Sequence, residues 1–300
     1  MTKDQAPVHE LSTVRDMLRL AVSRFLQAGL HYGHGTDNAW DEAVYLVLHT
    51  LHLPPDTLEP FLDARLLASE RERVLAVIER RVNERIPAAY LTGEAWLRGH
   101  RFYVDERVIV PRSPIAELLE QGLAPWIADP KAVESVLDMC TGSGCLAILA
   151  ALAFPHAQVD AVDLSAGALE VAARNVADYG LQDRLALHRS DLFDALPERP
   201  YDLIVCNPPY VNAESMAALP GEYRHEPEMA LAGGADGMAL VARILRAAPR
   251  YLAGHGLLVL EIGHERSHFE AAFPQLEPVW LETEAGSDQI LLLERRQLAP

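Results

Sequence analysis

The chain has 300 residues, half of them hydrophobic, and a mean hydropathy of +0.02. This length suits one large α/β domain and a smaller one. No apolar run approaches the roughly 20 residues that cross a bilayer, and no apolar stretch of signal-peptide length follows residues 1–5. The 26 Lys and Arg against 43 Asp and Glu give a net charge of −17, which disfavours stable binding to a phosphate backbone. Such a charge is compatible with a basic protein partner, and equally with solubility alone.

The cysteine and histidine content favours a cytoplasmic protein without a metal site. The three cysteines, Cys140, Cys145 and Cys206, are odd in number and lack C-x-x-C spacing. This pattern suits a reducing compartment and small buried side chains. The twelve histidines form no plausible set of metal ligands.

Helical periodicity dominates residues 9–85. Apolar side chains recur at helical spacing up to Gly29, and two further stripes cover residues 40–48 and 74–82. We therefore expect an N-terminal helical domain over residues 1–86.

The pattern changes over residues 87–112, which we interpret as a β-hairpin linker. Three short strand-like runs, at residues 95–97, 101–104 and 108–110, are joined by Gly99 and by an Asp-Glu pair. The sequence Pro-Arg-Ser-Pro at residues 111–114 then predicts a helix start, with Ser113 as N-cap and Pro114 at the first position. Arg112 either contacts substrate or cofactor or forms a structural salt bridge.

A strand, a glycine turn and a helix follow at residues 135–154. The strand ends at Asp138, and Gly142 and Gly144 allow the backbone to approach a ligand closely. A second strand ends at Asp163, about 20 residues past the glycines, where a carboxylate can accept both hydroxyls of a ribose. The unit predicts a nucleoside-containing cofactor.

The glycine turn also fits a dinucleotide-binding pattern, so a nicotinamide cofactor is an alternative. Asp138 argues against it, because a carboxylate at that strand end repels a pyrophosphate but attracts an ammonium group. A third strand, residues 184–188, leads to Asp191-Leu192, where an acid can meet an adenine amine.

A fourth strand, residues 201–206, ends in Asn207-Pro208-Pro209-Tyr210. Proline cannot donate to a sheet ladder, so the Pro208 carbonyl is left as an acceptor beside the Asn207 side-chain oxygen. Two adjacent acceptors can hold both hydrogens of a planar –NH2 group, and Tyr210 can stack on its plane. The alternative is a simple Pro-Pro turn.

Acids at three successive strand ends, followed by this turn, resemble class I S-adenosylmethionine-dependent methyltransferases that modify amide or nucleobase nitrogens. Over nearly the whole chain the sequence resembles the bacterial protein-(glutamine-N5) methyltransferase family. That resemblance implies an α/β fold with a Rossmann-like, seven-stranded, mostly parallel sheet in a catalytic domain over residues 113–300. It also implies a substrate-docking role for the helical domain, with mechanical support of the catalytic domain as the alternative.

The resemblance also implies roles for individual residues. Asn207, Pro208 and Tyr210 would be catalytic, and Pro209 and Arg112 would join them in binding substrate. S-adenosylmethionine would be bound by Asp138, Thr141, Gly142, Ser143, Gly144, Asp163, Leu164, Asp191, Leu192 and Asn207.

Two loops indicate the substrate. Residues 222–228, Glu-Tyr-Arg-His-Glu-Pro-Glu, and the Pro-Arg-Ser-Pro segment are more similar to the branch acting on large-subunit ribosomal protein L-three than to the release-factor branch. The loop over residues 211–237 is too long for a mere connector. Methylation of release factors is the alternative. Two further alternatives are more distant. The net charge argues against a DNA adenine methyltransferase, and the complete set of cofactor acids argues against a non-catalytic assembly factor.

Overall fold

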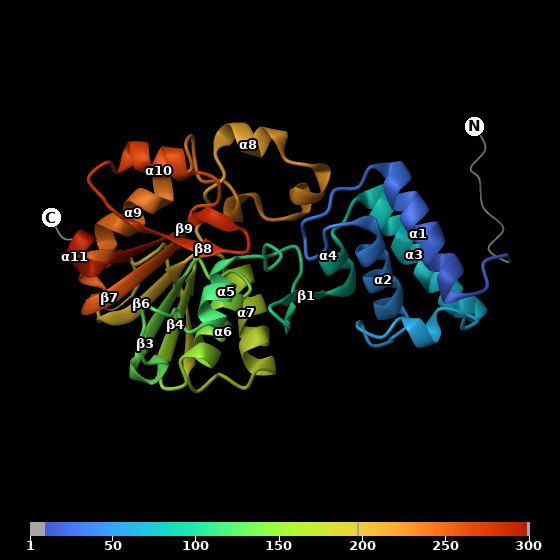
Figure 1. The fold of residues 1–300 in the computed structure, drawn as a ribbon, viewed down its shortest axis with the longest axis horizontal. Helices are drawn as coiled ribbons and strands as arrows, with labels where there is room; N and C mark the ends of the chain where they lie inside the picture. The colour runs from blue at the N-terminus through green and yellow to red at the C-terminus, as the bar shows by residue number, and fades with distance from the viewer. Residues whose placement is uncertain (1–9, 197, 299–300) are drawn as a thin grey trace. The chain divides into compact units, whose positions relative to one another are not determined.

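The computed structural model describes residues 10–196 and 198–298; His9, where the helical pattern begins, lies outside them. The chain forms two compact units (Figure 1). The helical unit holds the described residues up to Glu94 together with Pro220–His225. The sheet unit holds Ala95–Leu219 and the described residues from Glu226 onward. Within the described ranges, no helix is both long enough and apolar enough to cross a bilayer.

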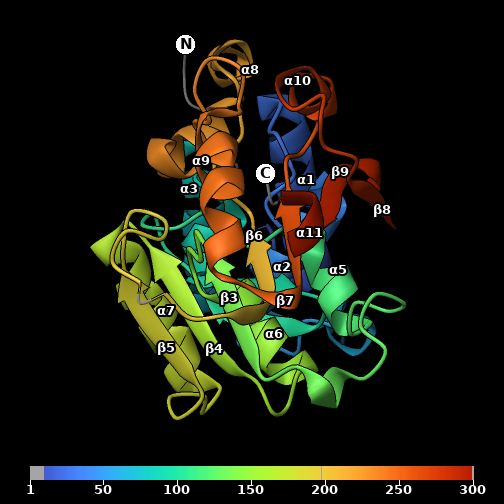
Figure 2. The same ribbon diagram turned by 90° about the vertical axis from the view of Figure 1, so that its left-hand side faces the viewer.

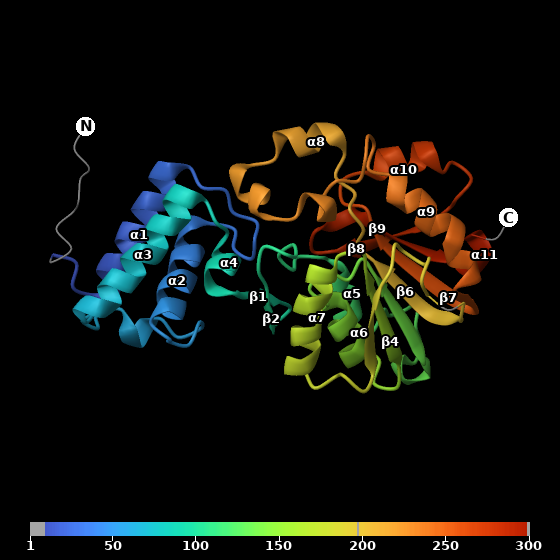
Figure 3. The ribbon, with the colours of Figure 1, turned by 180° about the vertical axis from the view of Figure 1, so that it is seen from behind.

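The helical unit is a bundle of three longer helices around its own apolar core. These are α1 (Val14–Ala28), α2 (Ala39–Thr50) and α3 (Ala68–Glu84), seen together in Figure 3. Met17, Phe25 and Leu46 are among the core side chains. Shorter helical segments complete the unit: α4 (Ala88–Thr92), η1 (Glu59–Phe61) and η3 (Gly221–His225).

Local capping explains where these helices begin and end. The Thr13 side chain accepts from the Asp16 amide while Asp16 accepts from the Thr13 amide, a reciprocal capping box before α1. Asn38 caps α2 in a similar way through the amides of Trp40 and Asp41. The predicted stop at Gly29 is confirmed, since this residue has φ 57° at the C-terminus of α1.

The sheet unit contains a seven-stranded sheet in the order β5-β4-β3-β6-β7-β9-β8. The first five strands in that order are parallel, while β9 runs antiparallel to β7 and β8. The predicted mostly parallel sheet is therefore confirmed. Its strands are β3 (Ser135–Met139), β4 (Gln158–Asp163), β5 (Leu185–Arg189), β6 (Tyr201–Cys206), β7 (Leu252–Glu261), β8 (Val279–Thr283) and β9 (Gly286–Glu294). A separate hairpin comprises β1 (Glu94–Leu97) and β2 (His100–Tyr103).

Helices cover both faces of this sheet (Figure 2). One face packs against α5 (Ile115–Glu120), α6 (Cys145–Ala153) and α7 (Ala166–Asp178). The other packs against α9 (Ala239–Ala247), α10 (Arg266–Ala272) and α11 (Arg295–Leu298). Burial on both faces explains why the central strands are nearly continuous apolar runs.

The strand predicted at residues 108–110 is wrong. Val108 and Val110 are buried, but the Val108 amide donates within a turn to the Asp105 carbonyl. The Val110 amide donates to the carboxylate of Glu226. A side chain therefore replaces the strand partner that the β-branched run would otherwise need.

The start of α5 also differs from the sequence prediction. Helix α5 begins at Ile115 with Pro114 as its N-cap, although the Ser113 hydroxyl still accepts from the Ile115 amide. The loop over residues 211–237 contains α8 (Ala213–Ala218), η3 and η4 (Glu228–Ala230). The helix after it ends at Ala247, followed by the turn η5 (Ala248–Arg250), because β7 already starts at Leu252.

Candidate active site

Strand register brings the predicted site residues to one edge of the sheet. Met139 of β3 pairs with Val162 of β4 on one side and with Cys206 of β6 on the other. Asp163 and Asn207 follow these partners directly in the chain, so they emerge at the same carboxyl edge. This is the edge where open α/β sheets bind ligands.

A pocket opens there within the sheet unit. Of the predicted residues, Gly142, Asp163, Leu164, Asp191, Leu192, Asn207 and Pro209 line it. Other lining residues come from segments that the sequence analysis did not assign to the cofactor site: Arg107, Val108, Ile109, Pro227, Met229, Ala230 and Leu240. The predicted residues Asp138, Thr141, Ser143, Gly144, Pro208, Tyr210 and Arg112 are not part of the lining.

Asp138 lies buried behind the β3–α6 turn. Its Oδ2 accepts from the Thr141 hydroxyl at 2.5 Å and from the Ala147 amide at 3.0 Å. Burial, together with the nearby charge of Asp163, raises the pKa of Asp138 to about 7. Oδ1 is buried and has no hydrogen-bond partner among the described residues. A buried carboxylate oxygen without a partner is costly, so this atom is suited to a positively charged ligand group.

The rest of the turn supports this arrangement by close packing. The Ser143 carbonyl accepts from the side chain of Asn175 on α7. Gly144 has φ 80°, and a Cβ there would lie 3.2 Å from the Ala172 Cβ. Glycine at this position therefore serves both the left-handed backbone and the close approach of α6 to α7.

Asp163 is held by backbone amides. Its Oδ2 accepts from Gly142 at 2.9 Å and its Oδ1 from Ser165 at 2.8 Å. Burial raises the pKa of Asp163, opposed by these same amide hydrogen bonds. Each carboxylate oxygen has a second acceptor position, so the group can still receive hydroxyl donors from a ligand in the pocket.

Two non-glycine residues in the pocket wall have left-handed backbones: Cys140 at φ 63° and Leu192 at φ 52°. Such conformations cost free energy and cluster at ligand sites. Beside Leu192, the Asp191 carboxylate lies 3.0 Å from the guanidinium of Arg243 on α9. This ion pair links the Asp191 side chain to α9.

The Asn-Pro-Pro-Tyr turn presents Asn207 to the pocket and anchors Tyr210 beside it. No hydrogen bond engages the Asn207 amide within the described chain, so its oxygen is available as an acceptor. The Tyr210 hydroxyl donates to Oε1 of Glu261 at 3.0 Å. A Cβ at Gly263 would lie 2.4 Å from the Tyr210 ring, so only glycine permits this packing.

Glu261 is a site residue that the sequence analysis missed. It ends β7, is buried, and also accepts a short hydrogen bond from the Ser113 hydroxyl. Burial raises its pKa to about 7, opposed by the hydrogen bonds from Ser113 and Tyr210. An acid directly after an apolar strand is the same signal that identified Asp138 and Asp163, so the sequence did carry the information.

Arg112 forms the salt bridge that the sequence analysis left as one of two possibilities. Its two terminal nitrogens lie 2.6 and 2.8 Å from the carboxylate oxygens of the buried Glu226. Contact of Arg112 with substrate remains a prediction. Because Pro227 and Met229 line the pocket, the ion pair supports the pocket wall.

Comparisons with known proteins agree with this fold and site. The Methyltransferase small domain family matches residues 121–219. The catalytic domain of hMettl16, solved with the MAT2A 3'UTR hairpin 6, shares the fold with a TM-score of 0.51. This alignment covers 77% of this chain and 84% of that chain at 14% identity. The fold and the strand-edge site together define a class I methyltransferase.

Closer relatives place the chain within this class. The ribosomal protein uL3 glutamine methyltransferase of Bordetella pertussis is 75% identical, covering 96% of this chain and 97% of the relative. The protein of the same name from Burkholderia pseudomallei is 64% identical, covering 99% of this chain and 98% of the relative. The chain belongs to the family of ribosomal protein uL3 glutamine methyltransferases.

Proposed function

We propose that this chain transfers the methyl group of S-adenosylmethionine to the side-chain amide nitrogen of a glutamine in ribosomal protein uL3. The names of the relatives, which match over nearly the full length, support the reaction and the substrate. The observation that carries the proposal is the position of Asn207. Asn207 lines the same pocket as Gly142 and Asp163, so a residue with an amide acceptor and the proposed nucleoside-binding edge share one cavity.

The residues of the pocket, together with Asp138 buried behind the β3–α6 turn, fit S-adenosylmethionine. The cofactor supplies an electrophilic methyl group on a sulfonium when bound. The unpartnered Oδ1 of Asp138 suits the ammonium of the methionine moiety. Asp163, oriented by the amides of Gly142 and Ser165, suits the ribose hydroxyls. Asp191 and Leu192, which line the same pocket, would recognise the adenine.

Asn207 and Pro208 would prepare the substrate amide. A glutamine nitrogen is a poor nucleophile, because its lone pair is delocalised into the carbonyl. The Asn207 side-chain oxygen and the Pro208 carbonyl would accept the two amide hydrogens and aim the nitrogen into the pocket. Their dipoles would also stabilise the positive charge that develops on nitrogen. No strong base is required before transfer, since the nitrogen becomes acidic only as it gains the methyl.

The substrate partner would be a basic protein. The net charge of −17 favours approach of a positively charged partner by electrostatic steering. We assign substrate docking to the helical domain and catalysis to residues 113–300, with the hairpin region as their linker. Stable DNA binding is not expected from this charge.

Labelled methyl transfer tests the proposal. The full chain is incubated with labelled S-adenosylmethionine and, separately, with purified uL3, release factors and duplex DNA, and modified residues are mapped by mass spectrometry. We expect label on a glutamine of uL3. Label on a release-factor glutamine instead would overturn the substrate, and label on adenine would overturn the reaction class.

A further inference from the structure

The loop that follows the Asn-Pro-Pro-Tyr turn is shared by the two compact units. Its segment Pro220–His225 belongs to the helical unit, whereas the chain on either side belongs to the sheet unit. The segment forms the short helix η3. A loop of the catalytic domain therefore contributes a structural element to the helical bundle.

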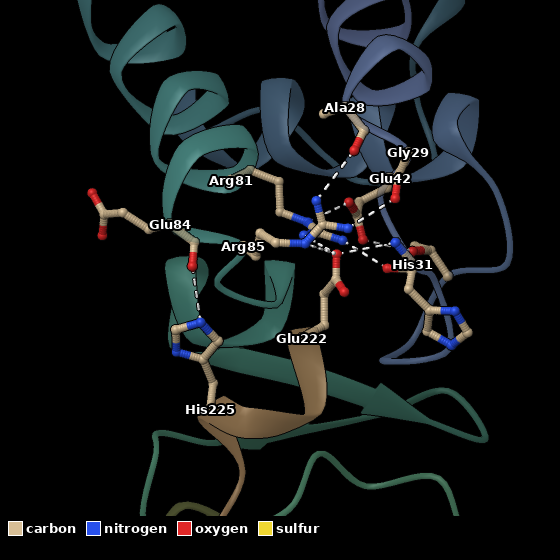
Figure 4. Close-up of polar contacts among 10 residues, drawn as sticks. Ala28, Gly29, His31, Glu42, Arg81, Glu84, Arg85, Glu222 and His225 are labelled. Carbon is tan, nitrogen blue, oxygen red and sulfur yellow. Dashed lines mark hydrogen bonds and ion pairs between the residues drawn. The ribbon is translucent and has the colours of Figure 1, made fainter. Parts of the chain in front are cut away.

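Glu222 fixes this segment within the helical unit (Figure 4). Its side chain is fully buried, and Oε1 accepts from the His31 amide at 3.0 Å. The same oxygen lies 3.4 Å from the Arg81 guanidinium and 3.3 Å from that of Arg85. Burial favours the neutral acid, but the His31 amide and the two cations hold the pKa of Glu222 below its ordinary value. Glu222 is therefore a buried carboxylate in its charged form.

The charges around Glu222 balance. Arg81 is also buried, and its Nε donates to Oε1 of Glu42 at 2.7 Å. Arg85 uses its terminal nitrogens to donate to the Ala28 and Gly29 carbonyls at the end of α1. Two acids thus face two cations. A buried ion network adds little net stability, but removing one member leaves an uncompensated charge. Such a network is better suited to holding the segment in one position than to increasing the free energy of unfolding.

Further contacts hold the rest of the segment. The His225 ring nitrogen lies 3.0 Å from the Glu84 carbonyl at the end of α3. The Tyr223 ring packs on His34, with ring centroids 4.5 Å apart. Glu222, Tyr223 and His225 therefore all contact other residues of the helical unit.

The residues that follow form part of the pocket wall. Glu226, buried in the sheet unit, accepts from the Val110 amide and pairs with Arg112. Only three residues separate it from Glu222, a span of at most about 14 Å even when extended. Pro227, Met229 and Ala230 then line the pocket.

We propose that Glu222 is a positioning residue for the cofactor pocket. Its pairs with Arg81 and Arg85 hold the segment Pro220–His225. Through this segment they position the pocket-lining residues Pro227, Met229 and Ala230. The segment that resembles the ribosomal-protein branch, residues 222–228, therefore has two parts. Residues 222–225 pack in the helical unit, and residues 226–228 belong to the sheet unit, where Pro227 lines the pocket. The inference rests on the proposed function only in taking S-adenosylmethionine as the pocket ligand.

Hydrogen exchange on the full chain without cofactor tests this directly. The amides of Ala230, Leu231 and Ala232 donate to the carbonyls of Pro227 and Glu228, and they report on the pocket wall. Glu222→Gln keeps the shape and removes the charge. We expect these three amides to exchange about tenfold faster. We also expect S-adenosylmethionine to bind about tenfold more weakly by calorimetry, which corresponds to roughly 1.4 kcal/mol.

Glu84→Gln is the matched control. It makes the same change on α3, where the Glu84 side chain is half exposed and lies 3.8 Å from the Arg80 guanidinium one helical turn away. We expect wild-type exchange at residues 230–232 and wild-type affinity. If Glu222→Gln accelerates exchange only in the helical unit, while residues 230–232 and the cofactor affinity stay unchanged, Glu222 is purely structural and the proposal is wrong.

A milder variant covers the case in which Glu222→Gln does not fold. Arg85→Gln removes one cation from the partly exposed side of the network. Faster exchange at residues 230–232 supports the proposal, and unchanged exchange there overturns it. Neither readout involves a protein substrate. The absence of methylation of uL3 would therefore overturn the proposed function without deciding the role of Glu222.

Discussion

The Tyr210 hydroxyl donates to Oε1 of Glu261 at 3.0 Å, and this hydrogen bond joins the Asn-Pro-Pro-Tyr turn to the end of β7. Glu261 is itself held by the Ser113 hydroxyl from the start of α5. The tyrosine ring lies against Gly263, which has no side chain to displace it. The position of Tyr210 is therefore set by the end of β7, which the start of α5 holds through Ser113.

Removing only the Tyr210 hydroxyl should slow methyl transfer while leaving cofactor binding intact. Tyr210→Phe keeps the ring but leaves the buried Glu261 oxygen without its donor. We expect single-turnover rates to fall by roughly tenfold, the effect of about 1–2 kcal/mol from one lost hydrogen bond to a polar group. Tyr179→Phe, which removes an exposed hydroxyl contact to the Arg101 carbonyl, is the control. Equal rates for both variants would show that the hydroxyl has no positioning role.

Stability should fall as pH rises through 7 because of Glu261. The pKa of Glu261 is raised in the folded chain to about 7 from an ordinary value of 4.5. The folded state therefore keeps a proton that the unfolded state has lost, and this contribution is full below pH 4.5 and gone above pH 7. We expect wild type to lose up to about 3 kcal/mol relative to Glu261→Gln between pH 4.5 and pH 8.

Urea unfolding of both proteins across this range measures the difference. Glu282→Gln, an exposed acid on β8, which β9 separates from β7, should follow wild type. A pH profile of Glu261→Gln that is parallel to wild type would place the titrating proton on another group.

Cofactor affinity should rise with pH through Asp138. The pKa of Asp138 in the free protein is about 7, and binding of an ammonium requires its charged form. Affinity for S-adenosylmethionine should therefore be about tenfold weaker at pH 6 than at pH 8. Asp138→Asn should bind weakly and lose this pH dependence, whereas Asp178→Asn, exposed at the end of α7, should keep it. Calorimetry that finds wild-type affinity independent of pH would exclude Asp138 as the ammonium partner.

Asp163→Ala should weaken cofactor binding and also loosen the turn around it. The substitution removes the proposed ribose contact, at a cost on the order of 1–3 kcal/mol. It also leaves the amides of Gly142 and Ser165 without their acceptor. We expect lower affinity in calorimetry together with a lower midpoint of thermal unfolding. Unchanged affinity would mean that the ribose lies elsewhere.

Local patterns in the sequence predict the strands and the polar residues at their ends, whereas the seven-stranded, mostly parallel sheet is implied by the family resemblance. Apolar runs ending in Asp138, Asp163 and Asn207 predict parallel strands whose polar ends meet at one edge. Long-range partners could not be predicted in this way. Nothing local shows that Glu226 accepts from the Val110 amide or that Glu222 lies among Arg81 and Arg85.

The same limit explains the wrong strand at residues 108–110. Its β-branched composition predicts a ladder, but a carboxylate from more than a hundred residues away supplies the partner instead. Arg112 is a second case in which the partner is distant in sequence. The sequence is compatible with either a ligand contact or a salt bridge, and the folded structure identifies Glu226 as the salt-bridge partner.

Single-turnover methyl transfer by Asn207→Ala at saturating S-adenosylmethionine tests the central claim most directly. The cofactor contacts proposed for Asp138, Asp163 and Asp191 remain in this variant, so it should fold and bind cofactor. Its transfer to uL3 should fall by about a hundredfold or more, because one aligned acceptor of the amide hydrogens is lost. Asn83→Ala, exposed on α3, is the matched control and should transfer normally. Transfer by Asn207→Ala at the rate of Asn83→Ala would contradict the amide-holding role of the Asn-Pro-Pro-Tyr turn.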